Sequence, residues 1–323
     1  MMQEHPTWLI HDSSKSDTYL DCPRKYFYEY VLGWRTDRPQ HDLHFGNAWH
    51  ISREHQLIYG YDDTAGAYLK FLEYYRSQFP EETDDLYRPK DPIAVGIALE
   101  TFRDERRNDL VDNELLFTET SGTVPINFSG RVLHYRMDSV LRRNEDGKIF
   151  SWDHKSAKRF SRVWADKFHL SIQNGTYTHC LYCMYPIEEV QGIEFCGTEF
   201  TFLTRGSKNR PAGYHINLLR VPAWKTAEQM NVWLWSINDL IDNIERDFDR
   251  LSHCKENDNV LMTFPMNPGS CTKYWGCAYH DYCLSWDNPL RRCQEPPLGF
   301  HSEWWNPADI VTTNKKNLEW PKE

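Results

Sequence analysis

Residues 130–155, GRVLHYRMDSVLRRNEDGKIFSWDHK, predict two strands joined by a tight turn. Side chains along a strand alternate between its two faces. The turn contains Asp146-Gly147, a strong hairpin signal because glycine tolerates the positive φ that such turns need. The strand after the turn, residues 148–155, places Asp153 and Lys155 on one face. An acid and a lysine two residues apart on a strand reach the same region of space.

An aspartate on each predicted strand suggests a metal site. Asp138 lies on the first strand and Asp153 on the second. A hard divalent ion binds oxygen ligands, so these two carboxylates suit it, and the backbone carbonyl of His154 is a further candidate ligand. Hydrolysis of a phosphodiester by a metal-activated water also needs positive charge for its transition state. Lys155 is placed to orient the water or to stabilise that charge.

The spacing acid-x-Lys is a weak signal by itself. Asp146-Gly147-Lys148 has the same spacing, and there the geometry of the turn explains the Asp-Gly pair. For Asp153 and Lys155 alone, a plain surface ion pair is as good an interpretation as a site. Other motifs are therefore needed to decide between the two.

Composition and charge limit the classes of protein. A chain of 323 residues with 15% aromatic and 26% charged residues is long enough for one large domain or two, and its composition is that of a folded protein. The formal net charge of −10 argues against a protein that coats nucleic acid nonspecifically, because phosphate binding depends on lysine and arginine. A net charge of −10 is still compatible with a local basic groove, and residues 155–162 are basic.

Targeting signals and cysteines indicate the compartment. The N-terminus has no apolar signal region, and no run approaches the length of a membrane span, so we expect a cytoplasmic protein without a membrane partner. In a reducing compartment, the nine cysteines indicate thiols or metal ligands before disulfides.

Periodicity predicts the remaining elements. The pattern at residues 226–251 is a heptad seam, which we interpret as a helix facing the core in preference to a dimeric coiled coil. Other predicted helices cover residues 15–20, 24–31, 45–59, 65–78, 92–110 and 163–185, and other strands cover 115–120, 193–203 and 214–219.

Four short motifs occur in one order along the chain. GNAWH at residues 46–50 comes first, Asp138 second and DHK at residues 153–155 third. Gln173 and Tyr177 follow, one turn apart on the helix predicted at residues 163–185. In this order the chain resembles the PD-(D/E)XK nuclease superfamily, and within it the RecB and AddB branch. The resemblance covers most of residues 14–283.

The resemblance implies an α/β fold with a restriction-endonuclease-like core, in which helices flank a central mixed sheet. It implies a deoxyribonuclease dependent on Mg²⁺ or Mn²⁺, an exonuclease of recombination or repair similar to stand-alone nucleases of bacteriophages. Its substrate would be single- or double-stranded DNA with an end, and a recombination or single-strand-annealing protein is an expected partner. The implied metal ligands are His50, Asp138, Asp153 and His154, and the implied catalytic residues are Asp138, Asp153, Lys155, Gln173 and Tyr177, the last two contacting the substrate phosphate or the lysine.

Cysteines near both ends resemble the iron–sulfur members of this branch. In those relatives one cysteine before the core and three after it hold a [4Fe–4S] cluster. Four thiolates also suit zinc. Such a clasp would close a loop of about 250 residues and so restrict the unfolded chain. The implied ligands are Cys22, Cys271, Cys277 and Cys283, with Cys254 or Cys293 as a possible replacement for one of them.

We expect four segments along the chain. Residues 1–112 would form a helical region with the first cysteine and the histidine motif, and residues 113–253 the nuclease core with its long final helix. Residues 254–293 would form the cysteine-rich segment and residues 294–323 a tail. Two other classes stay open: a catalytically vestigial DNA-binding or assembly protein on the same scaffold, and an iron–sulfur redox protein.

Overall fold

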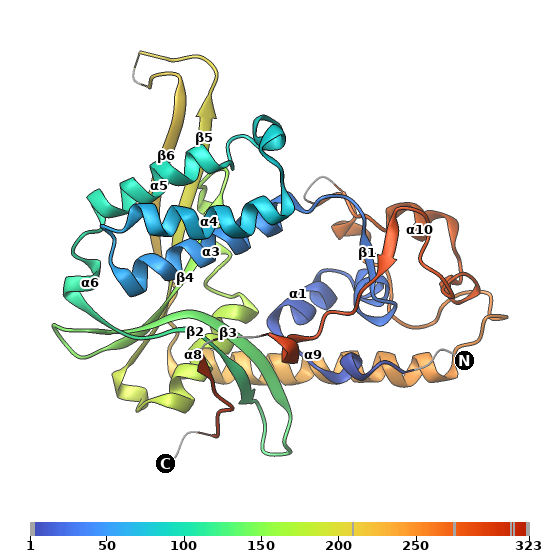
Figure 1. Ribbon diagram of the computed structural model, residues 1–323. Helices are drawn as coiled ribbons and strands as arrows, with labels where there is room; N and C mark the ends of the chain where they lie inside the picture. The colour runs from blue at the N-terminus through green and yellow to red at the C-terminus, as the bar shows by residue number, and fades with distance from the viewer. Residues whose placement is uncertain (1–3, 209, 274–275, 311, 313, 321–323) are drawn as a thin grey trace. The chain divides into compact units, whose positions relative to one another are not determined.

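A computed structural model describes residues 4–208, 210–273, 276–310, 312 and 314–320 (Figure 1). It contains two compact units, each built from several stretches of the chain. One unit combines Met1–Pro39, Thr123–Tyr135 and Ala227–Val311, and the other combines Gln40–Gly122, Arg136–Thr226 and Thr312–Glu323. The division into four segments along the chain stays a prediction. No described helix is long and apolar enough to cross a membrane.

The second unit is built on a six-stranded mixed sheet with the order β6-β5-β4-β3-β2-β8. The β3–β4 and β5–β6 pairs are antiparallel, whereas β4–β5 and β2–β8 are parallel. The predicted hairpin at residues 130–155 is therefore present as β3 and β4, in the middle of the sheet. The strands are β2 (Asn113–Pro125), β3 (Val132–Arg143), β4 (Ile149–Ala157), β5 (Val190–Leu203), β6 (Gly213–Pro222) and β8 (Asn314–Lys315).

Helices cover both faces of this sheet, which confirms the predicted architecture. On one face Phe200 of β5 contacts Phe45 and Trp49 at ring distances of 5.2 and 5.5 Å. Phe195 points to the other face, since it lies an odd number of residues away, and there it stacks on Phe168 at 4.2 Å. The first face is covered by α3 (His41–Tyr59), α4 (Thr64–Gln78) and α5 (Pro92–Glu105), which are seen side by side in Figure 1. The short helix α6 (Asp109–Asp112) follows α5 in the chain. The helices that follow β4 are α7 (Arg162–Asp166) and α8 (Ile172–Met184).

Two helices predicted as continuous are broken. Residues 163–185 divide into α7 and α8, because buried Phe168 anchors the chain between them and Ser171 caps the new helix. The Ser171 hydroxyl accepts a hydrogen bond from the Asn174 N–H at 3.2 Å. Residues 92–110 likewise divide into α5 and α6. The prediction of one long helix in each place was wrong.

The first unit is mainly helical. Its helix α9 (Ala227–His253) buries Met230, Ile237, Ile241 and Ile244, most of the heptad seam, within the single chain, as expected of a core-facing helix. A two-stranded antiparallel sheet joins β1 to β7, so part of the predicted tail is structured. The other elements are α1 (Ser13–Asp21), α2 (Pro23–Tyr26), a π-helical turn (Phe27–Val31), β1 (Trp34–Thr36), α10 (His280–Ser285) and β7 (Phe300–Ser302).

Gly197 of β5 makes a close approach to the segment between β4 and α8. A Cβ atom on Gly197 would lie 2.4 Å from Trp164 and 2.7 Å from Phe160. We expect Gly197→Val to lower the free energy of unfolding by about 1 to 3 kcal/mol in urea titrations, as overpacking does. Trp164→Ala in the same chain should recover part of that loss, because it removes the clash.

A matched glycine predicts the opposite sign. Among the described residues, nothing lies within 4 Å of the position that a Cβ on Gly46 would take, inside α3. Gly46→Ala should therefore raise the free energy of unfolding by up to about 1 kcal/mol, since alanine is the better helix former. A Gly197→Val chain as stable as the wild type would contradict this account.

Candidate active site

The predicted site lies where strands β3 and β4 separate. Their antiparallel pairing runs from Arg142–Ile149 to Ser139–Trp152. Beyond it the N–H of His154 donates to the carboxylate of Asp138, Oδ2, over 2.8 Å. A side-chain oxygen thus takes the place of a strand carbonyl, and the buried Asp138 carboxylate lies between the two strands.

A possible metal-binding group forms around Asp138. His50 of α3, Glu119 of β2 and Asp138 each offer one ligand atom, and these atoms lie within 4.8 Å of one another. His50 Nδ1 is 2.9 Å from Asp138 Oδ2, and Glu119 Oε2 is 3.2 Å from the Arg136 Nε. Two carboxylates with an imidazole suit Mn²⁺ and accept Mg²⁺. The donor set therefore fits the divalent ion that the sequence implies.

Glu119 was not identified from the sequence. It lies on the strand predicted at residues 115–120, on the same face as Leu115 and Phe117, and an acid at the end of such an alternation is usually solvated. One signal in the sequence pointed to Glu119, because its strand directly precedes the hairpin that carries Asp138 and Asp153. In the structure the backbone φ of Glu119 is +42°, which is unusual for a residue with a side chain.

The electrostatics of this group favour a bound cation. Burial raises the pKa of Glu119 to about 7, and the negative charge of Asp138 contributes further. Burial acts to raise the pKa of Asp138, but the facing His50, together with Lys155 and His154, holds this pKa well below its usual range. Asp138 is thus ionised at neutral pH while Glu119 is held close to half protonation. A divalent cation between them would relieve the repulsion.

Asp153 and Lys155 form an ion pair supported by α8. Lys155 Nζ is 2.6 Å from Asp153 Oδ1, and the Gln173 amide donates to Asp153 Oδ2 at 2.9 Å. Gln173 also donates to the Tyr177 hydroxyl at 3.0 Å, and that hydroxyl donates to the carbonyl of Arg136 on β3. Gln173 and Tyr177 therefore hold β3 and β4 in place, and the contact of Gln173 is to Asp153 and not to the lysine.

The remaining predicted metal ligand is His154. Its ring is buried, and among the described residues neither ring nitrogen has a hydrogen-bond partner. Burial, with Arg53 nearby, lowers its pKa well below the ordinary value, so the ring is neutral. The ring lies 6.5 Å from the ring of Phe102 on α5, while the backbone N–H of His154 donates to the Asp138 carboxylate. The use of the His154 carbonyl as a ligand stays a prediction.

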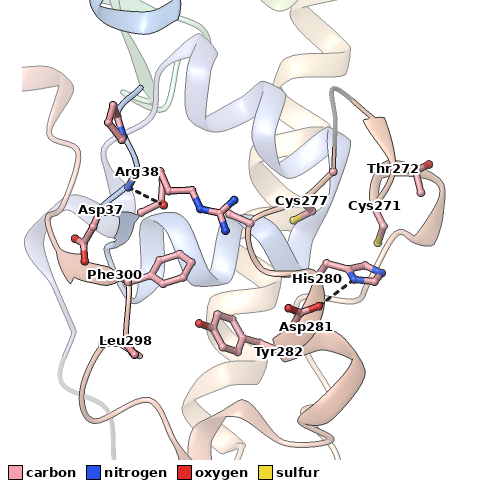
Figure 2. A pocket seen from close by; sticks show the side chains of 15 residues that line it. Asp37, Arg38, Cys271, Thr272, Cys277, His280, Asp281, Tyr282, Leu298 and Phe300 are labelled. Atoms are coloured by element: carbon pink, nitrogen blue, oxygen red, sulfur yellow. Dashed lines mark hydrogen bonds and ion pairs between the residues drawn. The ribbon is translucent and has the colours of Figure 1, made fainter. Parts of the chain in front are cut away.

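The four predicted cluster cysteines all lie in the first unit. Burial raises the pKa of the Cys277 thiol, with Cys22 and Cys271 as further causes. Burial likewise raises the pKa of Cys283 to about 11, and the other three thiols add to the shift. The four thiols are thus close enough to interact. Cys271 and Cys277 line a cavity of about 1060 Å³ (Figure 2).

Among the described residues, no three of these sulfur atoms lie within 4.8 Å of one another. The Asn267 N–H donates to Cys22 Sγ at 3.4 Å, a contact that suits a thiolate. Cys293 instead lies beside Leu290, whose carbonyl accepts its thiol at 3.4 Å.

In this mixed sheet the central hairpin carries two aspartates and a lysine, and α3 supplies a histidine beside them. Such an arrangement is the framework of a metal-dependent nuclease. The chain belongs to the PD-(D/E)XK nuclease superfamily, whose family model matches residues 13–284. A solved structure titled "Crystal structure of SSO0001" shares 12% identity, covering 61% of this chain and 73% of that one, and its TM-score of 0.24 is too low to support an argument. No curated protein matches the chain significantly.

The metal group gives a direct test. We expect Glu119→Gln to weaken Mn²⁺ binding to the full chain at least about tenfold in calorimetric titrations, because the change removes an anionic ligand. Glu100→Gln, an exposed glutamate on α5, is the matched control and should leave the affinity unchanged. Equal affinities for the Glu119→Gln and wild-type chains would show that Glu119 is not a ligand.

Proposed function

We propose that this protein is a deoxyribonuclease dependent on Mg²⁺ or Mn²⁺, and that it is an exonuclease of the RecB and AddB type. The main support is the carboxylate of Asp138 between β3 and β4, with His50 and Glu119 on one side and the ion pair of Asp153 and Lys155 on the other strand. The proposed metal ligands are His50, Asp138, Asp153 and the carbonyl of His154, to which we add Glu119.

The bound ion would supply an activated water and would polarise the scissile phosphate. The chain's own residues do the rest. Lys155 is partly exposed, with 27% of its side chain accessible, so its ammonium can reach a phosphate while Asp153 holds its position. In a largely buried site this positive charge stabilises the developing negative charge more strongly than it would in water. Gln173 fixes Asp153, and Tyr177 fixes β3 beside it.

The setting proposed for this activity follows the family resemblance. We propose DNA with an end, single- or double-stranded, as the substrate, and recombination or repair in the cytoplasm as the process. A recombination or single-strand-annealing protein, as in bacteriophage systems, is the proposed partner. The support is membership of the nuclease superfamily together with the order of the motifs from residue 46 to residue 177.

The change that tests catalysis is Lys155→Ala. We expect it to lower the rate of DNA cleavage by about 10²- to 10³-fold while DNA affinity changes much less, because the lysine acts on the transition state. Lys148→Ala is the matched control, since Lys148 belongs to the same acid-x-Lys spacing in the turn and donates to the Glu188 carbonyl at 2.6 Å. Its cleavage rate should equal that of the wild type.

The assay uses end-labelled single- and double-stranded DNA, and closed circular DNA in parallel. Cleavage of linear DNA alone supports an exonuclease. Undiminished cleavage by the Lys155→Ala chain would overturn the assignment of this site. A wild-type chain that binds DNA but neither binds a divalent ion nor cleaves would instead be a vestigial DNA-binding or assembly protein.

We propose separately that Cys22, Cys271, Cys277 and Cys283 hold a [4Fe–4S] cluster. The support is the resemblance, with one cysteine before the core and three after it, together with the effect of the other three thiols on the pKa of Cys283. Zinc stays the alternative, because four thiolates suit it as well. Arg24 and Lys25 beside the thiols favour their charged, ligating form.

Absorption spectra test this cluster. Protein purified without oxygen should absorb visible light and contain iron and sulfide in equal amounts, as thiolate-bound clusters do. Cys22→Ser should lose this absorption, whereas Cys293→Ser should keep it. A colourless wild-type protein with bound zinc would overturn the proposal. A cluster that cycles reversibly in a protein without DNA cleavage would indicate a redox protein.

A further inference from the structure

Positive charge is concentrated at two places in the second unit, although the whole chain is acidic at −10. The turn between β5 and β6, residues 204–212, contains Arg205, Lys208 and Arg210 and no acidic residue. The end of β4 and the segment after it, residues 155–170, contain five lysines and arginines and one aspartate. Both local charges oppose the sign of the whole protein, so neither follows from composition alone.

The sheet brings both basic segments to the same edge. Strands β4 and β5 are parallel, and Lys155 is the register partner of Gly197. The residues that follow β4 and those that follow β5 therefore leave the sheet at one end. Arg205, Lys208 and Arg210 are all exposed there. In Figure 1 the β5–β6 hairpin extends well beyond α5, and its turn is the part farthest from the helices.

The hairpin is regular enough to hold its turn at a defined distance. Pairing of β5 with β6 is continuous from Glu194–Pro222 to Leu203–Gly213. Within the turn, the Ser207 N–H donates to the Arg210 carbonyl at 2.6 Å. The six steps along β5 from Gly197 to Leu203 span about 20 Å at the rise of a strand. The basic turn thus lies about 20 Å beyond the catalytic lysine along the sheet.

The segment after β4 is also held in place, by a row of aromatic rings. Phe160 lies 4.7 Å from Trp164, which lies 4.8 Å from Phe168, and Phe168 stacks on Phe195 of β5. The Phe160 N–H donates to Glu199 at 2.6 Å. With its rings on the sheet, the segment exposes the cations Lys158, Arg159, Arg162 and Lys167 to solvent.

We propose that these two basic segments form one binding track for the phosphate backbone of the DNA substrate, leading from Lys155 to the turn of the β5–β6 hairpin. This inference rests on the proposed nuclease function, and it adds the direction and the length of bound substrate. In a strand with stacked bases each phosphate rises about 3.4 Å along the helix axis, so a track of about 20 Å covers about six of them. The acidic remainder of the chain repels DNA and so favours this single path.

The positive charge of both segments complements the negative phosphates of DNA, which makes a DNA strand the occupant of the track. Local acids partly balance the segment after β4, because Lys158 lies 3.4 Å from Asp42 and Arg162 lies 3.2 Å from Asp166. The sequence of the turn holds three cations in nine residues without an acid of its own. The outer end of the track is therefore its most positive part. Substrates too short to reach the turn would miss this attraction.

The test compares two triple variants of the full chain. In Arg205→Ala/Lys208→Ala/Arg210→Ala the turn loses its charge. Lys70→Ala/Arg103→Ala/Arg107→Ala makes the same charge change on α4, α5 and the turn after α5. Binding is measured with Ca²⁺ in place of Mg²⁺, using labelled single strands of about four and about twenty nucleotides, which lie on either side of the six-phosphate estimate.

We expect the first variant to bind the long strand about tenfold more weakly, as the loss of three exposed ion pairs predicts. Its affinity for the short strand should change much less, and the slope of log affinity against log salt concentration should fall by about two. The second variant should bind the long strand as the wild type does. Equal weakening by both variants, or unchanged binding of the long strand by the first, would overturn the track.

Cleavage assays separate this inference from the proposed function. A wild-type chain that binds the long strand through the turn without cleaving it would leave the track standing and remove the nuclease. If the wild-type chain cleaves DNA and Arg205→Ala/Lys208→Ala/Arg210→Ala binds the long strand as tightly as the wild type does, the nuclease stands and the track is removed.

Discussion

One hydrogen bond sets the geometry of the site: the His154 N–H donates to the carboxylate of Asp138. A buried backbone N–H left without an acceptor costs about 1 to 3 kcal/mol, so the end of β3–β4 pairing needs a replacement acceptor at this point. Asp138 provides it. Because the donor is backbone, the carboxylate is tied to the strand that carries Asp153 and Lys155, and the spacing between the acids does not depend on flexible side chains.

The helices on the two faces complete what the strands begin. From one face α3 brings His50 to Asp138, and from the other α8 brings Gln173 to Asp153 and Tyr177 to the backbone of β3. Each aspartate thus has one partner from a helix. Burial then makes the charges costly unless they are balanced, and burial together with the charge of Asp138 raises the pKa of Glu119.

The sequence predicted the parts of the site that depend on local pattern. Alternation and the Asp-Gly turn placed β3 and β4, and the spacing of three or four residues placed His50 and the pair of Gln173 and Tyr177 on helices. What it missed depends on contacts distant in the chain. Glu119 is half-buried beside His50 and Asp138, and the break between α7 and α8 depends on the stacking of Phe168 on Phe195 of β5. Strand β8 is two residues long and pairs through its backbone, which leaves no periodicity to detect.

Gly197 links Lys155, the proposed catalytic lysine, to the segment that follows β4. As the register partner of Lys155, it fixes the lysine's place beside β5. Because it has no side chain, Trp164 and Phe160 can pack directly on the sheet at the same position. A larger residue would keep the strand pairing but would push the aromatic row, and the basic residues it carries, away from the lysine. The same backbone position therefore fixes both the place of Lys155 beside β5 and the packing of the basic segment that follows β4.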